Sequence, residues 1–355
     1  MPCDGTKTIG STADATSLAK ECPTVFGDLV IASGMAADVN LTGVLVVDGH
    51  MTNEPCSSNS PCNLNITKIS SNTIKQIGGD VEFRDLGALT NISFPALKWA
   101  DNTIVLENLA SLETIGLTNL TSVDQLQVIG APKLSSIDAD HVDFGPGYFG
   151  IHANRSSLVE ISGVGLESLG SLLHGPMWGS TADIVAIYDD PKLNYIQMNM
   201  PYVGNLTILG NGNVTLLLGP TWENYVNGGD DAANINMGTV LLSGLSNFTI
   251  QDSVEDFTAT AFSIVNNTFR ECPLWLNDIE NLTIASNPEL NEIDWPDLEN
   301  ALNWTLQSVV IQDNPNLEMN TTIIDAKDKS TGDWLWARAN VSTLVFDGAF
   351  SNAFL

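Results

Sequence analysis

Positive charge is scarce in this sequence. Only 13 of its 355 residues are Lys or Arg, against 42 Asp or Glu, so the formal net charge at pH 7 is −29. A protein that binds nucleic acid must neutralise phosphates with a basic face, and docking on anionic lipid needs a similar basic cluster. The composition therefore excludes nucleic acid as a partner and argues against electrostatic binding to membranes.

Charged residues of both signs are also few, at 15% of the chain. The surface must therefore consist largely of Asn, Ser, Thr and Gly, as is typical of a glycoprotein. No apolar run is long enough to span a bilayer. No signal peptide precedes Cys3, so a secreted form needs a leader that has been removed or lies outside this sequence. Near the other end, residues 344–348 resemble the start of a further repeat, and we expect additional sequence after Leu355.

Motifs for common chemistry are missing as well. The chain has no Gly-x-Ser-x-Gly, no His-Glu-x-x-His and no phosphate-binding loop. It has no Cys-x-x-Cys pair, which argues against a structural zinc site. We therefore predict no cofactor, no metal site and no catalytic residues.

Clustered acids are the one feature that favours an enzyme, because polysaccharide-cleaving β-helix enzymes use carboxylate pairs or acidic calcium ligands. The candidates are Asp189 with Asp190, Asp230 with Asp231, and Asp138, Asp140 and Asp143 beside His141. A structural role is the favoured interpretation of each group. Asp190 precedes a proline in a turn, the second pair lies in a Gly-rich loop, and the third group follows a surface turn, where weak metal binding is the alternative.

Other candidate ligand-binding side chains are dispersed. The arginines fall in different repeats, which is a poor arrangement for clamping an anionic substrate. They are Arg84, Arg155, Arg270 and Arg338. Several aromatic residues lie in or near interruptions of the repeat, where packing of a loop is favoured over stacking on sugars. They are Trp178, Trp222, Tyr225, Trp334 and Trp336.

What the chain does have is an internal repeat. Its clearest copy, 282–293, reads as a short alternating strand, a turn at Asn-Pro and two further apolar residues. Related copies begin near residues 81, 104, 126, 185 and 309. Phe83, Leu106, Val128 and Ile151 follow one another at spacings of 22 or 23 residues, and such a fixed period is the signature of a solenoid.

One repeat cannot bury its own apolar side chains. Leu282 and Ile284 point to the same side of a strand, and Leu290 and Ile293 turn back to that side after Pro288 has ended the strand. Stacking successive coils buries all four and aligns the strands in a parallel sheet. The sequence therefore predicts a mainly β protein, a right-handed parallel β-helix or leucine-rich-type solenoid.

The predicted layout is an N-terminal cap over residues 1–26 and one elongated solenoid over residues 27–355. Ser11 and Asp14 have the spacing of a helix cap, so the N-terminal cap contains a short helix, residues 15–21. The coils are about 20–24 residues long. Three insertions interrupt them, near 155–180 with helix-like spacing at 166–173, near 219–236 as a surface loop, and near 321–339.

Five cysteines are present, and four lie within the first 62 residues. Cys3 with Cys22 would fasten the cap, and Cys56 with Cys62 would close a small loop, although spacing alone leaves other pairings open. Cys272 is then left as a buried free thiol.

Thirteen acceptor sites for N-glycosylation occur along the chain, more than chance gives for this composition. Some of them are also part of the strand pattern. They are Asn40, Asn65, Asn91, Asn119, Asn154, Asn205, Asn213, Asn247, Asn266, Asn281, Asn303, Asn320 and Asn340. This density predicts a secreted glycoprotein.

The opening segment resembles the receptor L-domain, the repeat domain of insulin- and epidermal-growth-factor-type receptors. Cys3 and Cys22 there precede a Gly-x-Leu-x-Ile strand at 27–31, and 282–290 resembles that family's coils. With the dense glycosylation sites, the chain is most similar to fungal GPI-anchored cell-wall organisation proteins, from Cys3 to about Leu317. It departs from them in lacking a Ser/Thr-rich stalk and a hydrophobic GPI tail.

This resemblance implies a non-catalytic protein at the fungal cell surface or in the cell wall, with a structural or recognition role. Cell-wall glycans or surface proteins are the implied partners, and membrane attachment would run only through a GPI anchor. Two alternatives stay open, a glycan-active parallel β-helix enzyme and a receptor-type ligand-binding module. Three or more converging acids would favour the enzyme, and a sheet face without glycosylation sites would favour the receptor type.

Overall fold

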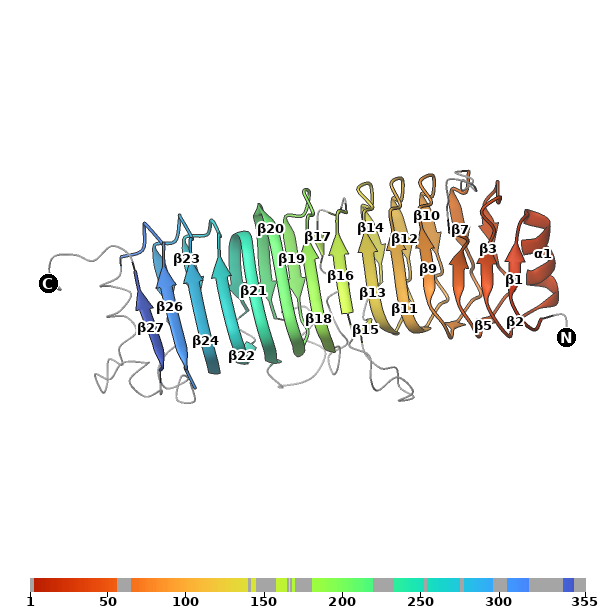
Figure 1. Ribbon diagram of the computed structural model, residues 1–355. Helices are drawn as coiled ribbons and strands as arrows, with labels where there is room; N and C mark the ends of the chain where they lie inside the picture. The colour runs from red at the N-terminus through yellow and green to blue at the C-terminus, as the bar shows by residue number, and fades with distance from the viewer. Residues whose placement is uncertain are drawn as a thin grey trace, which may run out of the picture. The chain divides into compact units, whose positions relative to one another are not determined.

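The computed structural model describes residues 3–55, 65–139, 142–144, 158–164, 166, 168–169, 181–219, 233–251, 254–274, 278–295, 305–318 and 341–347. The chain divides into two compact units, Met1–Lys192 and Leu193–Leu355. Each unit is built from parallel strands stacked coil upon coil, so the predicted parallel β-solenoid is confirmed (Figure 1). The single domain over 27–355 stays a prediction.

The described part of unit 1 contains one helix, α1 (Thr12–Glu21), and two parallel sheets. Its large sheet contains β1 (Lys7–Ile9), β2 (Thr24–Val25), β3 (Leu29–Ile31), β5 (Val46–Val47), β6 (Met51–Asn53), β8 (Gln76–Ile77), β9 (Val81–Arg84), β11 (Trp99–Glu107), β13 (Ser122–Ile129), β15 (Asp143–Phe144), β16 (Leu158–Ser162), β17 (Ser168–Leu169) and β18 (Thr181–Tyr188). Its small sheet contains β4 (Val39–Asn40), β7 (Lys68–Ser70), β10 (Asn91–Ser93), β12 (Thr114–Gly116) and β14 (Ser136–Asp138).

The predicted apolar stack forms the core of unit 1. Leu106 pairs in register with Phe83 on one side and Val128 on the other, and all three are buried. The next member is Ile161 on β16, not Ile151, so the predicted 23-residue step after Val128 is wrong. This coil is longer than its neighbours, because the chain between β15 and β16 adds residues that the earlier coils lack, and the predicted strand 148–151 lies outside the described residues.

A left-handed residue ends many of the strands. Asp85, Asn108 and Asp189 have φ between 56° and 58°, and Gly130 and Gly163 take the same place in their coils with φ of 68° and 62°. Asp, Asn and Gly are the residues that adopt this conformation most readily. The position thus explains why short polar residues recur after each strand.

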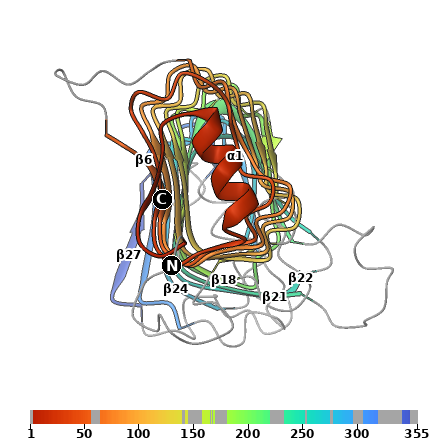
Figure 2. The same ribbon diagram turned by 90° about the vertical axis from the view of Figure 1, so that its right-hand side faces the viewer.

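The predicted N-terminal helix and its disulfide are present, and the helix begins at Thr12, three residues before the predicted start. Ser11 caps α1 by accepting a hydrogen bond from the backbone N–H of Asp14, and Cys3 forms a disulfide with Cys22 just after the helix. Figure 2 shows α1 lying across the first coils. Ala15 and Leu18 are the buried residues of the helix. Cys56 and Cys62 lie outside the described residues, so their pairing stays a prediction.

Unit 2 has a large parallel sheet and a separate two-stranded sheet. The large sheet contains β19 (Tyr195–Met198), β20 (Tyr202–Leu218), β21 (Ala233–Ile250), β22 (Val254–Val265), β24 (Asp278–Ala285), β26 (Ser308–Gln312) and β27 (Thr343–Phe346). The small sheet contains β23 (Glu271–Pro273) and β25 (Glu292–Asp294).

Two expectations about the insertions need correction. The predicted loop 219–236 ends in strand, because β21 begins at Ala233 and pairs with β20. Helix-like spacing at 166–173 is contradicted where the chain is described, since Ser168 and Leu169 form β17. Apolar spacing in a short segment does not distinguish a buried helix from a strand. The insertion 321–339 lies outside the described residues.

Buried asparagines connect the last coils of unit 2. The Oδ1 atom of Asn287 accepts from the backbone N–H of Asn267 at 2.9 Å, and Oδ1 of Asn314 accepts from the N–H of Asn287 at 3.0 Å. Their side-chain amides donate to backbone carbonyls, among them Ile264 and Ile284. The Asn-Pro turn of the repeat therefore serves the neighbouring coils as well as its own, which satisfies buried polar groups that would otherwise be costly.

Candidate functional site

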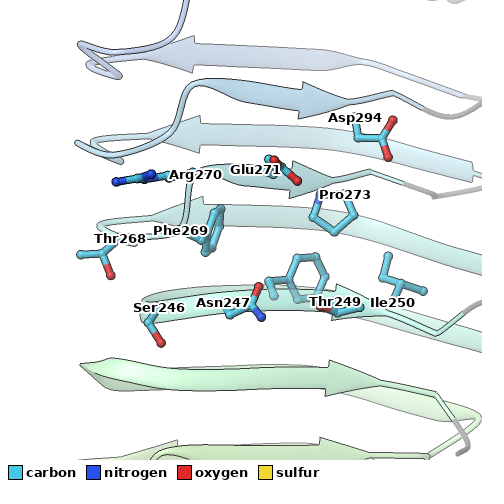
Figure 3. Close-up of a pocket in the computed structure, with 11 residues that line it drawn as sticks. Ser246, Asn247, Thr249, Ile250, Thr268, Phe269, Arg270, Glu271, Pro273 and Asp294 are labelled. Atoms are coloured by element: carbon cyan, nitrogen blue, oxygen red, sulfur yellow. The ribbon is translucent and has the colours of Figure 1, made fainter.

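A pocket of 540 Å³ opens in unit 2, along the line where the two sheets separate. Beyond Ser243, β21 no longer pairs with β22, and in the described residues its neighbour β23 pairs only with β25. The residues lining this seam pocket come from the second half of β21, from β23 with the turn before it, and from β25 (Figure 3). A pocket of this size is in the range that holds a small organic ligand or a sugar.

The seam pocket is polar at its opening and apolar beneath. Phe248, Ile250 and Phe269 are almost fully buried and form its floor. The groups accessible to a ligand are hydroxyl, amide and charged side chains together with one proline ring. They are Ser246, Asn247, Thr249, Thr268, Arg270, Glu271, Pro273 and Asp294. Donors and acceptors around a partly apolar surface suit a sugar, which has hydroxyls at its edge and C–H groups on its face.

Acids in this region face one another across the small sheet. Glu271 lies in register with Glu292, and Pro273 lies in register with Asp294. Cys272, between them, is a completely buried free thiol, and burial raises its pKa. Arg270 is the charged group of opposite sign in the pocket. The sequence analysis placed Arg270 in a different repeat from the other arginines and did not predict the pocket. The pocket forms where two sheets separate, and no sequence motif marks that place.

The described glycosylation sites of unit 1 fall on one side of its coils. Asn40 is on β4 and Asn91 is on β10, while Asn65 and Asn119 lie in turns that flank β7 and β12. All four thus belong to the small sheet or its turns. The described strands of the large sheet of unit 1 contain no acceptor asparagine.

That sheet contains charged side chains in adjacent strands. Arg84 on β9 forms ion pairs with Glu82, at 2.5 Å between Nε and Oε1, and with Glu107 on β11. Further along, the Tyr188 hydroxyl donates to the Glu160 carboxylate, and this hydrogen bond raises the pKa of Tyr188. Partly exposed ion pairs contribute little to stability, so these residues have scope for a role in recognition.

Unit 2 presents a different outer face. Its central row is uncharged, and residues in register along it are Thr207, Leu241, Ser263, Thr283, Val310 and Val345. Acceptor asparagines are present on this sheet, at Asn205 on β20 and Asn281 on β24. Asn213, Asn247 and Asn266 are also exposed. Asn154, Asn303, Asn320 and Asn340 lie outside the described residues.

The acids considered for catalysis do not converge in the described residues. Asp190 is buried and accepts a hydrogen bond from the backbone N–H of Val164 at 2.9 Å, and burial raises its pKa to about 7. Asp138 accepts from the Thr118 hydroxyl in the neighbouring coil. Asp140, His141, Asp230 and Asp231 are not described. Among the residues that are described, no group of three potential metal-binding side chains occurs.

The exposed tryptophan Trp99 is not among the aromatic residues considered from the sequence. The five considered from the sequence, Trp178, Trp222, Tyr225, Trp334 and Trp336, all lie outside the described residues. The structure instead exposes Trp99 on β11, with 42% of its surface accessible and the Lys98 ammonium 5.8 Å from its ring centroid. Trp99 lies inside the repeat pattern, where a packed side chain is expected, so its exposure was not predicted from the sequence.

The fold and these surfaces define a parallel β-solenoid with polar outer faces, some of which contain acceptor asparagines. No described helix is long and apolar enough to cross a membrane. The chain is similar to Protein ecm33 of Aspergillus fumigatus, with 24% identity over 270 residues, 76% of this chain and 57% of that protein. The chain thus spans little more than half the length of that relative. No family model and no solved structure matches it. The match to Protein ecm33 supports the resemblance to fungal cell-wall proteins seen in the sequence.

Proposed function

We propose that this chain is a secreted, non-catalytic glycoprotein of the fungal cell surface with a structural or recognition role in organising the cell wall. The observation that carries the proposal is the similarity to Protein ecm33 over three quarters of the chain. In this function the coils act as a rigid support that presents long side-chain rows to wall glycans or to other surface proteins.

The chemistry of the surface is consistent with this role. Thirteen acceptor sites and few basic residues suit a glycoprotein outside the cell. A disulfide at Cys3 and Cys22 suits an oxidising compartment. The anchor is a further part of the proposal, since GPI attachment follows from the family resemblance alone.

Deletion and complementation in the source fungus test the proposal. We expect the deletion strain to be hypersensitive to a dye that binds wall polysaccharide, and the wild-type gene to restore growth. A variant in which Val309→Asp places a charge in the stacked core should fail to restore it, because a buried unpaired charge destabilises the coil. Equal growth of the deletion and parent strains under wall stress would refute the proposed role.

A glycan-active enzyme is the second candidate, and the seam pocket is the observation that favours it. Its acids are Glu271 and Asp294, with Arg270 nearby. If the protein is non-catalytic, the double variant Glu271→Gln/Asp294→Asn restores growth as well as the wild type. If the pocket hydrolyses glycans, that variant fails although it is folded and secreted, and the wild type releases sugars from isolated cell walls.

A receptor-type module is the third candidate. It is favoured by the large sheet of unit 1, whose described strands contain no acceptor asparagine, so that a protein partner could approach them without meeting a glycan attached there. Arg84→Ala with Glu107→Ala would then weaken partner binding in a pull-down from cell-surface extract. Glycosylation-site variants on the opposite side, such as Asn40→Gln, would leave binding unchanged.

A further inference from the structure

We propose that the seam pocket of unit 2 is the seat of the chain's own N-linked glycan, attached at Asn247, and that the first sugars of this glycan close the gap between β21 and β23. The inference rests on the proposed secreted glycoprotein. It goes beyond it by assigning one glycan a structural position and by giving the pocket an occupant of defined chemistry.

The acceptor site itself forms one wall of the pocket. Asn247 and Thr249, the two recognised residues of the Asn-Phe-Thr acceptor, both line it, and Phe248 between them points inward and is buried. Alternation along the strand therefore turns both polar side chains outward into the same hollow. Asn247 is exposed, so its amide is accessible for attachment of a sugar.

The opposite wall offers partners for an N-acetylglucosamine unit. Glu271 can accept hydrogen bonds from sugar hydroxyls, and Arg270 can donate to the acetamido carbonyl. Pro273 adds an apolar surface for the C–H groups of the ring. In Figure 3 Asn247 lies on β21 facing the strand that contains Glu271 and Pro273, so a sugar on its amide would begin between these walls.

The strand pairing at the seam gives a physical reason for a sugar to bind there. Neighbouring strands in the coils of unit 2 are joined by ladders, but in the described residues no ladder joins the second half of β21 to β23. Strand edges left open present backbone donors and acceptors. A sugar rich in hydroxyls and bearing one amide can pair with such groups while filling the hollow.

Site-resolved digestion of the native secreted protein tests this. The protein is produced in yeast and treated under native conditions with an endoglycosidase that cuts between the two core N-acetylglucosamines, and glycopeptides are followed by mass spectrometry. Asn205, exposed on β20 of the same unit and outside the pocket, is the matched control. We expect cleavage at Asn247 to be about tenfold slower than at Asn205, as a seated state favoured by about 1.4 kcal/mol would give. After denaturation the two rates should be equal.

Variants provide a second measurement. Asn247→Gln and Thr249→Ala both abolish attachment by different changes, and both should lower the melting temperature by the same few degrees, whereas Asn205→Gln should not. When both proteins are produced without glycosylation in bacteria, Thr249→Ala and the wild type should have the same melting temperature.

The outcomes separate the two proposals. Glycans at neither site would refute the secreted glycoprotein and this inference together. A glycan at Asn205 with none at Asn247, or equal native cleavage rates at both, would refute the seated glycan alone.

Discussion

Asp190 provides the sharpest test of how the coils are connected. It takes the place in its coil that Asn267, Asn287 and Asn314 take in theirs, directly after a left-handed residue. Its Oδ1 accepts from the Val164 N–H at 2.9 Å, as the asparagine Oδ1 atoms accept from theirs. The difference is that a carboxylate brings a charge into a buried position where an amide brings none.

Burial is the largest cause of the raised pKa of Asp190, about 7, and the nearby charge of Asp189 adds to it. An unfolded aspartate titrates near 3.9. Because the folded pKa lies above the unfolded one, the folded state holds the proton more tightly. The contribution of Asp190 to stability is therefore fully present below pH 4 and is lost as the pH rises through 7. Three pKa units correspond to about 4 kcal/mol as an upper value.

Asp190→Asn should remove this dependence, since the amide keeps an acceptor for Val164 and carries no charge. We expect the variant to equal the wild type within about 1 kcal/mol at pH 4.5 and to exceed it by up to about 4 kcal/mol at pH 8. Urea unfolding of both proteins at several pH values gives the difference in unfolding free energy, in which the titration of all other groups cancels.

Asp189→Asn is the matched control. It removes the neighbouring charge at an exposed position whose φ of 58° asparagine also tolerates. It should shift the pH dependence slightly and not abolish it. The reasoning is wrong if the difference between Asp190→Asn and wild type does not change with pH, or if the variant is the less stable protein at pH 8.

Three further predictions follow from the fold. Asn287→Ala removes a buried side chain that both accepts and donates between coils, and should lower the unfolding free energy by about 2–4 kcal/mol in urea titrations; a loss below 0.5 kcal/mol would contradict this. Replacing Cys3 and Cys22 by serine removes a disulfide between residues 19 apart in the sequence and should lower the unfolding free energy by about 3 kcal/mol. Adding reductant to the wild type should lower its unfolding free energy to the same value. Asn91 should be unmodified in glycopeptide mass spectrometry, because its Oδ1 is buried and its Nδ2 donates to Thr114 at 2.5 Å.

The repeat could be predicted from sequence because each coil needs the same buried positions. Phe83, Leu106 and Val128 stack as their spacing indicates, and the cap follows from Ser11 and Asp14. The step to Ile151 was wrong because a fixed period cannot reveal where a coil becomes longer. Here the stack continues at Ile161, beyond the longer connection between β15 and β16.

The candidate site was less predictable, for a different reason. The pocket arises where β21 leaves β22 and β23 pairs with β25, which is a property of pairing between distant segments. The residues that line the pocket, such as Arg270 and Thr249, follow the repeat pattern, so nothing in the sequence marks them as part of a pocket. Acceptor asparagines could be found from sequence, but their exposure could not, as the half-buried Asn91 illustrates.

The helix α1 over the first coils also affects whether this chain can associate with other chains. In the described residues β1 pairs only with β3, so its other edge would offer a ready template for another chain if α1 and its disulfide were absent. Solenoids need such an end piece for solubility, because an uncovered terminal coil leaves an edge at which other chains can pair. The ten residues of α1, with the disulfide beside them, thus protect this end of unit 1 from pairing with another chain.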